Sequence, residues 1–164
     1  KIVIAGESGG GYICLGAMVL LAEHGEGDLV KLAIPEVPMV DDYCFSDPLA
    51  MTIEERKSNL TMQKIWKLIA NDFDQQKTNP HLFPGKTSED IMEKFPPTVI
   101  IEPEFDMFIT ETTRLAGRIR RAGRLLEFVL IPGATHISGH IPGTKSRKLY
   151  YDILTTIAKE YIHS

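Results

Sequence analysis

The chain has 164 residues, of which 43% are hydrophobic and 24% charged, and its formal net charge is −4. This length fits one domain that buries its own core, and the weak acidity offers no electrostatic attraction for nucleic acid or an anionic membrane. The longest apolar run, Tyr12 to Ala22, is shorter than the roughly 20 residues of a transmembrane helix. The sequence does not indicate a compartment, so the cytoplasm is only the default.

Strand-like and helix-like segments alternate along the chain. Short apolar runs bounded by glycine or proline predict strands at residues 1–5, 29–34, 98–106 and 125–133. Helical periodicity predicts helices at residues 12–24, 53–73, a short segment ending at 95, 109–122 and about 145–161. This alternation is typical of an α/β fold, with a mostly parallel sheet of about four strands and helices on both faces. The whole chain, residues 1–164, is expected to form a single domain.

Three local patterns lead to further expectations. Five arginines between Arg114 and Arg124 predict a solvated helix face. Cys14, inside an apolar run, is expected to be buried, and with Cys44 it lacks the spacing of a metal site. In the helix at 53–73, one apolar side is expected from Leu60, Ile65, Trp66, Leu68 and Ile69.

The segment Gly6-Glu7-Ser8-Gly9-Gly10 lies between the first strand and the first helix and fits G-x-S-x-G, the nucleophile elbow. Such a turn strains the serine backbone and needs small neighbours, and the following helix points N–H groups at the reacting oxygen. A phosphate-binding loop of a dinucleotide fold is the alternative. It is disfavoured because the G-x-G-x-x-G spacing is absent and because the second strand runs into Pro35 without an acidic residue at its end.

A nucleophilic serine needs an acid and a base, which follow it in the order acid, then histidine, in this kind of fold. Asp106 comes just after the third strand and His136 after the fourth. Since the carboxyl ends of parallel strands share one edge of the sheet, we expect Ser8, Asp106 and His136 to converge there. The competing residues are Glu102 and Glu104 for the acid, and His140 for the base. His24, His81 and His163 are expected to be structural or exposed.

With these motifs the chain resembles the hormone-sensitive-lipase-like esterases and arylacetamide deacetylases of the α/β-hydrolase fold. The resemblance covers residues 1 to about 162 and rests on "GESGGG", Pro96-Pro97, "EPEFD", "RRAGRLLEFVLIPG" and "GATH". It implies Ser8 as nucleophile, Asp106 as acid and His136 as base. One departure is that Ile137 and Ser138 follow the histidine, where the family usually has a small residue or phenylalanine.

A larger departure is that the resemblance implies an upstream half, with further strands, a lid and an H-G-G-G segment that completes the oxyanion hole. No H-G-G-G occurs in this sequence, so Gly9 is the one oxyanion donor expected here. The chain therefore reads as the C-terminal half of the fold. Its strand at residues 1–5 would leave an exposed sheet edge, and the missing half or another chain is the partner expected along it.

The chemistry expected of these residues is acyl transfer to Ser8 and hydrolysis of a small-molecule ester, with no metal or organic cofactor. The alternatives are a binding or structural module on a hydrolase scaffold, or an inactive fragment that needs its missing half. Glu7 is expected to form a structural hydrogen bond or ion pair, so that Glu7→Gln lowers stability without abolishing turnover.

Overall fold

The computed structural model describes residues 2–42 and 52–162. Its elements follow the predicted order, with small shifts of their ends. In chain order they are β1 (Ile2–Glu7), α1 (Gly9–Glu23), β2 (Val30–Glu36), α2 (Ile53–Ile69), α3 (Glu89–Met92), β3 (Thr98–Phe105), α4 (Ile109–Arg121), β4 (Leu125–Thr135) and α5 (Lys145–Ile157).

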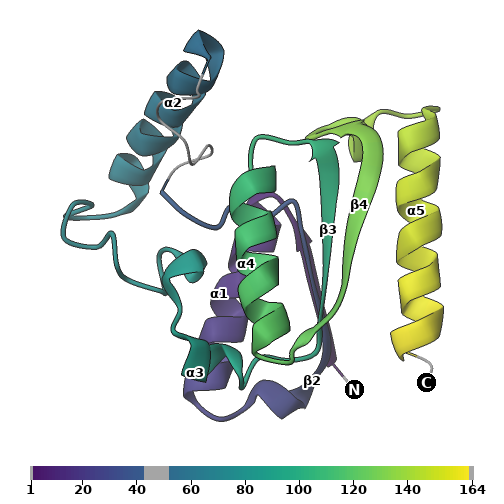
Figure 1. The fold of residues 1–164 in the computed structure, drawn as a ribbon, viewed down its shortest axis with the longest axis horizontal. Helices are drawn as coiled ribbons and strands as arrows, with labels where there is room; N and C mark the ends of the chain where they lie inside the picture. The colour runs from purple at the N-terminus through teal and green to yellow at the C-terminus, as the bar shows by residue number, and fades with distance from the viewer. Residues whose placement is uncertain (1, 43–51, 163–164) are drawn as a thin grey trace.

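The four strands form one sheet in the order β1-β2-β3-β4, and every neighbouring pair is parallel. Helices α1 and α4 lie on one face of this sheet and α5 on the other (Figure 1). A buried cluster that includes Leu15, Ile100 and Ile119 joins the sheet to α1 and α4, and a second one around Leu32, Val99 and Ile157 joins it to α5. The prediction of an α/β fold with a parallel sheet and helices on both faces is confirmed.

Strand β2 continues through Pro35 to Glu36, two residues beyond the predicted end. Pro35 has no N–H to donate, and it falls in the row of alternate β2 N–H groups that point toward β3, so the pairing of β2 with β3 lacks one hydrogen bond there. Ala33 donates to Pro97 and Val37 to Ile101, and the missing donor falls between them. The expectation that no acidic residue ends this strand was therefore wrong, since Glu36 does. The absent G-x-G-x-x-G spacing is the argument against a dinucleotide site that remains.

Helix α2 projects away from the sheet (Figure 1) and is attached through an aromatic cluster that contains Trp66, Phe73, Phe83 and Phe108. The side of α2 that is buried is not the one predicted. Met62, Trp66 and Ala70 are buried, whereas the other four residues expected on the apolar side, Leu60, Ile65, Leu68 and Ile69, are exposed. The prediction holds for Trp66 and is wrong for the other four, because aromatic packing around Trp66 sets the orientation of the helix.

The arginines of α4 are not simply a solvated face. Arg118 is only 23% exposed and donates hydrogen bonds to the carbonyls of Gly85 and Thr87. Arg121 pairs with Glu89 of α3. The expectation of a solvated face is wrong for Arg118, which binds the segment between α2 and α3 through these two hydrogen bonds. Cys14 is buried, as predicted, whereas Cys44 lies outside the described residues.

Candidate active site

Ser8 occupies the turn between β1 and α1 with φ 54° and ψ −114°. This conformation is sparsely populated for a residue with a side chain and costs on the order of 1–3 kcal/mol. Two glycines permit the turn. A Cβ on Gly6 would lie 2.3 Å from the Gly10 carbonyl oxygen, and one on Gly11 would lie 2.6 Å from that of Glu36.

The neighbours of Ser8 were expected to be small for lack of space, and this expectation is wrong for Gly9 and Gly10. A Cβ on Gly9 or Gly10 would meet nothing within 4 Å in the described structure, so neither is required to be small. Helix α1 begins at Gly9, and the Tyr12 N–H donates to the Ser8 carbonyl. The backbone N–H groups that precede Tyr12 lie in the first turn of α1 and have no carbonyl partner within the helix. The Gly9 N–H is one of these groups.

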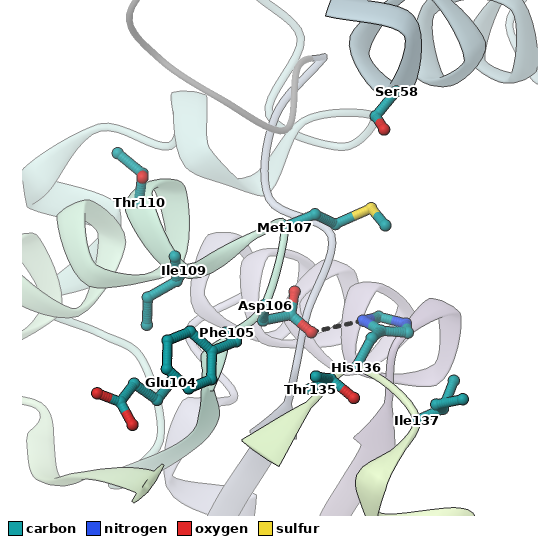
Figure 2. Close-up of a pocket in the computed structure, with 10 residues that line it drawn as sticks. All are labelled: Ser58, Glu104, Phe105, Asp106, Met107, Ile109, Thr110, Thr135, His136 and Ile137. Atoms are coloured by element: carbon teal, nitrogen blue, oxygen red, sulfur yellow. Dashed lines mark hydrogen bonds and ion pairs between the residues drawn. The ribbon is translucent and has the colours of Figure 1, made fainter. Parts of the chain in front are cut away.

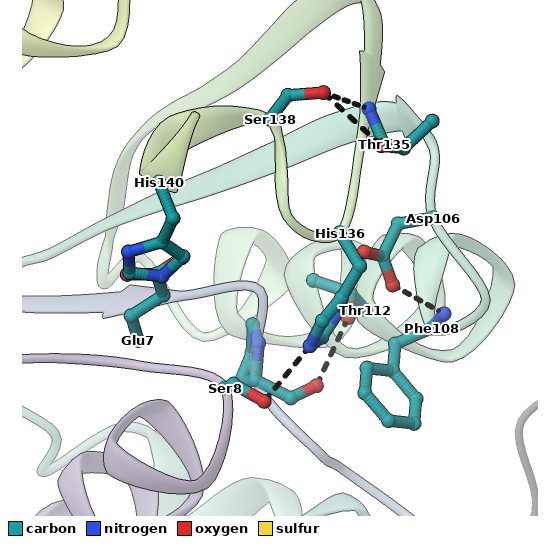
Figure 3. Close-up of polar contacts among 10 residues, drawn as sticks. Glu7, Ser8, Asp106, Phe108, Thr112, Thr135, His136, Ser138 and His140 are labelled. Atoms are coloured by element: carbon teal, nitrogen blue, oxygen red, sulfur yellow. Dashed lines mark hydrogen bonds and ion pairs between the residues drawn. The ribbon is translucent and has the colours of Figure 1, made fainter. Parts of the chain in front are cut away.

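Ser8, His136 and Asp106 meet at the carboxyl edge of the sheet (Figure 3). The Ser8 Oγ lies 2.9 Å from the His136 Nε2, and the His136 Nδ1 lies 2.7 Å from the Asp106 Oδ2. A hydroxyl, an imidazole and a carboxylate joined in this order can move a proton from the serine oxygen to the imidazole.

Asp106 is held from a second side as well. It is 4% exposed, and its Oδ1 accepts a 2.7 Å hydrogen bond from the backbone N–H of Phe108. The Phe108 ring packs edge-on against the His136 imidazole, with centroids 5.5 Å apart. The sequence reasoning missed Phe108, although an aspartate that accepts from the N–H two residues later is a known turn pattern.

The His136 imidazole has a shifted pKa. Its hydrogen bond to Asp106 raises the pKa above the ordinary value of 6.5, against partial burial, and the negative charges of Asp106 and Glu7 act in the same upward direction. Burial, followed by the charge of Glu7, raises the pKa of Glu36 to about 7. Glu36 therefore changes charge near neutral pH, and His136 keeps its proton to a higher pH than a free histidine does.

The competing residues lie in other surroundings. His140 contacts Glu7, with 2.7 Å between Nε2 and Oε1, which gives Glu7 the ion pair expected for it. Glu104 accepts a hydrogen bond from the Gly133 N–H, 2.8 Å long. Glu102 is fully buried. His81 pairs with Glu23, His24 ends α1, and His163 lies outside the described residues.

A cavity of about 710 Å³ opens beside His136 and Asp106 (Figure 2). Phe105, Met107, Ile109 and Ile137 supply most of its apolar lining, and Ser58 of α2 contributes from above the sheet edge. The cavity adjoins the imidazole, so a small molecule in it can reach His136.

Within residues 2–42 and 52–162, no group of three or more histidines, cysteines, aspartates and glutamates is arranged to hold a metal ion. In the same part of the chain, no helix is long and apolar enough to cross a membrane.

Comparison with known proteins agrees with this architecture. A family model described as alpha/beta hydrolase fold matches residues 1–138, and no curated protein sequence matches the chain significantly. Among solved structures, esterase Est22 superposes with a TM-score of 0.77 at 23% identity, over 97% of this chain and 47% of its own.

Two further solved esterases give a similar result. Brefeldin A esterase, a bacterial homologue of human hormone-sensitive lipase, has a TM-score of 0.71 at 22% identity, over 96% of this chain and 45% of its own. Carboxyl esterase 2 from the mycorrhizal fungus Tuber melanosporum has a TM-score of 0.71 at 18% identity, over 93% and 50%. The chain thus spans about half the length of these structures. Sequence identities this low support similarity of fold and nothing more specific.

Proposed function

We propose that this chain, which belongs to the alpha/beta hydrolase fold family, forms the catalytic part of a serine esterase. The observation that supports the proposal most strongly is the continuous hydrogen-bonded chain from Ser8 through His136 to Asp106, which starts at a strained strand-to-helix turn. In this proposal Ser8 is the nucleophile, His136 the general base and Asp106 the orienting acid.

The reaction then proceeds by acyl transfer. As the Ser8 oxygen attacks the ester carbonyl, His136 takes its proton, and Asp106 holds the imidazole in the required tautomer and stabilises its positive form. His136 next gives the proton to the departing alcohol. A water molecule activated by His136 releases the acid from the acyl-enzyme.

The Gly9 N–H is the proposed oxyanion donor within this chain, because it lies at the start of α1 beside Ser8. A single missing donor lowers catalysis by roughly 100- to 1000-fold. We therefore propose that a segment outside this chain supplies the remaining donors and pairs with β1. The finer family assignment, to the hormone-sensitive-lipase-like esterases and arylacetamide deacetylases acting on small to medium uncharged esters, belongs to the same proposal.

The direct test is labelling of the full-length protein with a fluorophosphonate, which reacts only with an activated serine. We expect one label per chain on Ser8, no label on Ser8→Ala, and unchanged labelling of Ser88→Ala, a serine beside α3 that serves as the control. Hydrolysis of a short-chain chromogenic ester should follow the same pattern. A folded wild-type protein that takes no label contradicts the proposal and favours the alternative, a non-catalytic binding or structural module.

A further inference from the structure

The two reactive side chains come from opposite edges of the described sheet. Ser8 follows β1 and His136 follows β4, and β2 and β3 lie between them. Neighbouring strands are about 4.8 Å apart, so three spacings separate the two edges by about 14 Å. The segment of residues 135–140, here named the histidine loop, must therefore reach back across the ends of the central strands to bring His136 to Ser8.

The histidine loop is braced internally by two hydrogen bonds. The Ser138 Oγ accepts from the Thr135 N–H at 2.8 Å, and the His140 N–H donates to the Ile137 carbonyl at 3.0 Å. The two bonds overlap along the chain and together span the loop that carries His136, from Thr135 to His140.

A further contact joins the histidine loop to the elbow. The His140 Nε2 lies 2.7 Å from the Glu7 Oε1, and Figure 3 shows the two side chains facing each other beside Ser8 and His136. Glu7 directly precedes Ser8 in the chain. The contact therefore links the neighbour of the proposed nucleophile to the end of the loop that holds the proposed base.

The exposure of this pair indicates what it does. The His140 side chain is 67% exposed and that of Glu7 24%, and exposed ion pairs contribute little to the stability of a fold. A contact that adds little stability but bridges the two parts of a reactive site acts mainly on their relative position.

We propose that Glu7 and His140 are a positioning pair, which holds the histidine loop so that His136 stays within hydrogen-bonding distance of Ser8. The inference rests on the proposed function for its kinetic consequences. Neither residue touches the reacting atoms, and both act through His136.

The charged groups around Glu7 define a readout that a purely structural contact would not change. Facing it are His140 of the histidine loop, Glu36 at the end of β2, and His136 itself. The negative charge of Glu7 is one of the causes that raise the pKa of His136, after Asp106. Glu7→Gln should therefore lower the pH at which His136 loses its proton.

The experiment compares Glu7→Gln, His140→Gln and the double variant in the full-length protein. The control is Asp152→Asn, which removes an exposed ion pair with Lys148 on α5. We expect each single variant to lower kcat by at most about fivefold, the limit set by the free energy of an exposed ion pair, with KM changed less than about twofold. The double variant should be no slower than the slower single variant. Thermal midpoints should match that of the control.

Titration of the His136 imidazole by NMR judges the positioning pair without turnover. The midpoint should fall in Glu7→Gln, and the proton on His136 Nδ1 should exchange faster with water in His140→Gln. If wild-type protein neither hydrolyses esters nor takes the fluorophosphonate, the proposed function fails, and the NMR result still decides on the pair. Unchanged exchange of the His136 Nδ1 proton in both variants would overturn the inference whatever the titration midpoint, because loss of the Glu7 charge by itself lowers that midpoint.

Discussion

At the scale of single residues, Asp106, which follows β3, and Glu102, within β3, differ in their surroundings. Asp106 accepts hydrogen bonds from His136 and from the Phe108 N–H. Glu102, four residues earlier, is fully buried. Burial, followed by the charge of Asp106, raises the pKa of Glu102 to about 9, and the opposing effect of the Thr112 hydroxyl is smaller. The sequence alone offered both as candidate acids. Both are buried, and the hydrogen bonds that Asp106 accepts from His136 and Phe108 distinguish it from Glu102.

Glu102 should make the stability of the fold depend on pH. The folded protein keeps the Glu102 proton up to about pH 9, whereas the unfolded chain releases it near the ordinary value of 4.5. The free energy of unfolding therefore falls as the pH rises between these two values. Glu102→Gln removes this contribution, so its unfolding free energy should fall less over the same range.

Urea denaturation of wild type and Glu102→Gln at about pH 5, 7 and 9 measures this difference. Glu36, with a pKa raised to about 7, adds a decline of the same sign, but it is present in both proteins and cancels in the comparison. Parallel pH curves for the two proteins would show that Glu102 is ionised in the folded state.

At the scale of elements, the strand–turn–helix unit around Ser8 depends on close approach at particular glycines. Gly6→Ala places a methyl group 2.3 Å from the Gly10 carbonyl oxygen, so the backbone of the elbow must move. We expect a large loss of stability and of Ser8 labelling. Gly10→Ala is the matched control, because its methyl group meets nothing within 4 Å, and alanine is favoured over glycine in a helix by roughly 1 kcal/mol. Equal losses in the two variants would contradict this reading of the turn.

Helix α2 offers a second matched pair. Trp66 is fully buried in the aromatic cluster, whereas Leu68, two residues away, is 88% exposed. Trp66→Ala should destabilise the attachment of α2 by about 3–5 kcal/mol, as for other buried aromatic residues. Leu68→Ala should change stability by less than about 0.5 kcal/mol. Hydrogen exchange along α2 measures both, and faster exchange of α2 in Leu68→Ala than in Trp66→Ala would be the contrary outcome.

At the scale of the whole molecule, the side formed by β1 and α1 carries exposed apolar side chains. Ile2 of β1 is 54% exposed, and Ile13 and Leu20 of α1 are 69% and 47% exposed. Strand β1 pairs with β2 on one side and is an edge of the described sheet. An exposed apolar strand edge favours pairing with another chain.

We predict that residues 1–164 expressed alone are inactive on esters and either aggregate or associate through β1. Adding the segment proposed above to pair with β1, in the same polypeptide or as a separate chain, should restore both a monodisperse size and fluorophosphonate labelling. Light scattering and a chromogenic ester assay measure the two properties. A monodisperse monomer whose turnover is abolished by Ser8→Ala would contradict the prediction.

The amino-acid sequence predicts the order of strands and helices, the elbow around Ser8, and the positions of Asp106 and His136 at the ends of parallel strands. These features are local, since they depend on apolar periodicity, on glycines at one turn, and on the common edge that parallel strands share. The contacts between side chains across the fold became known from the three-dimensional arrangement of these elements. Hydrogen bonds from Ala33 and Val37 flank Pro35 inside β2, the aromatic cluster buries Trp66 of α2, and the histidine loop brings His140 to Glu7. Such contacts join residues far apart in the chain, and no local pattern encodes their distance.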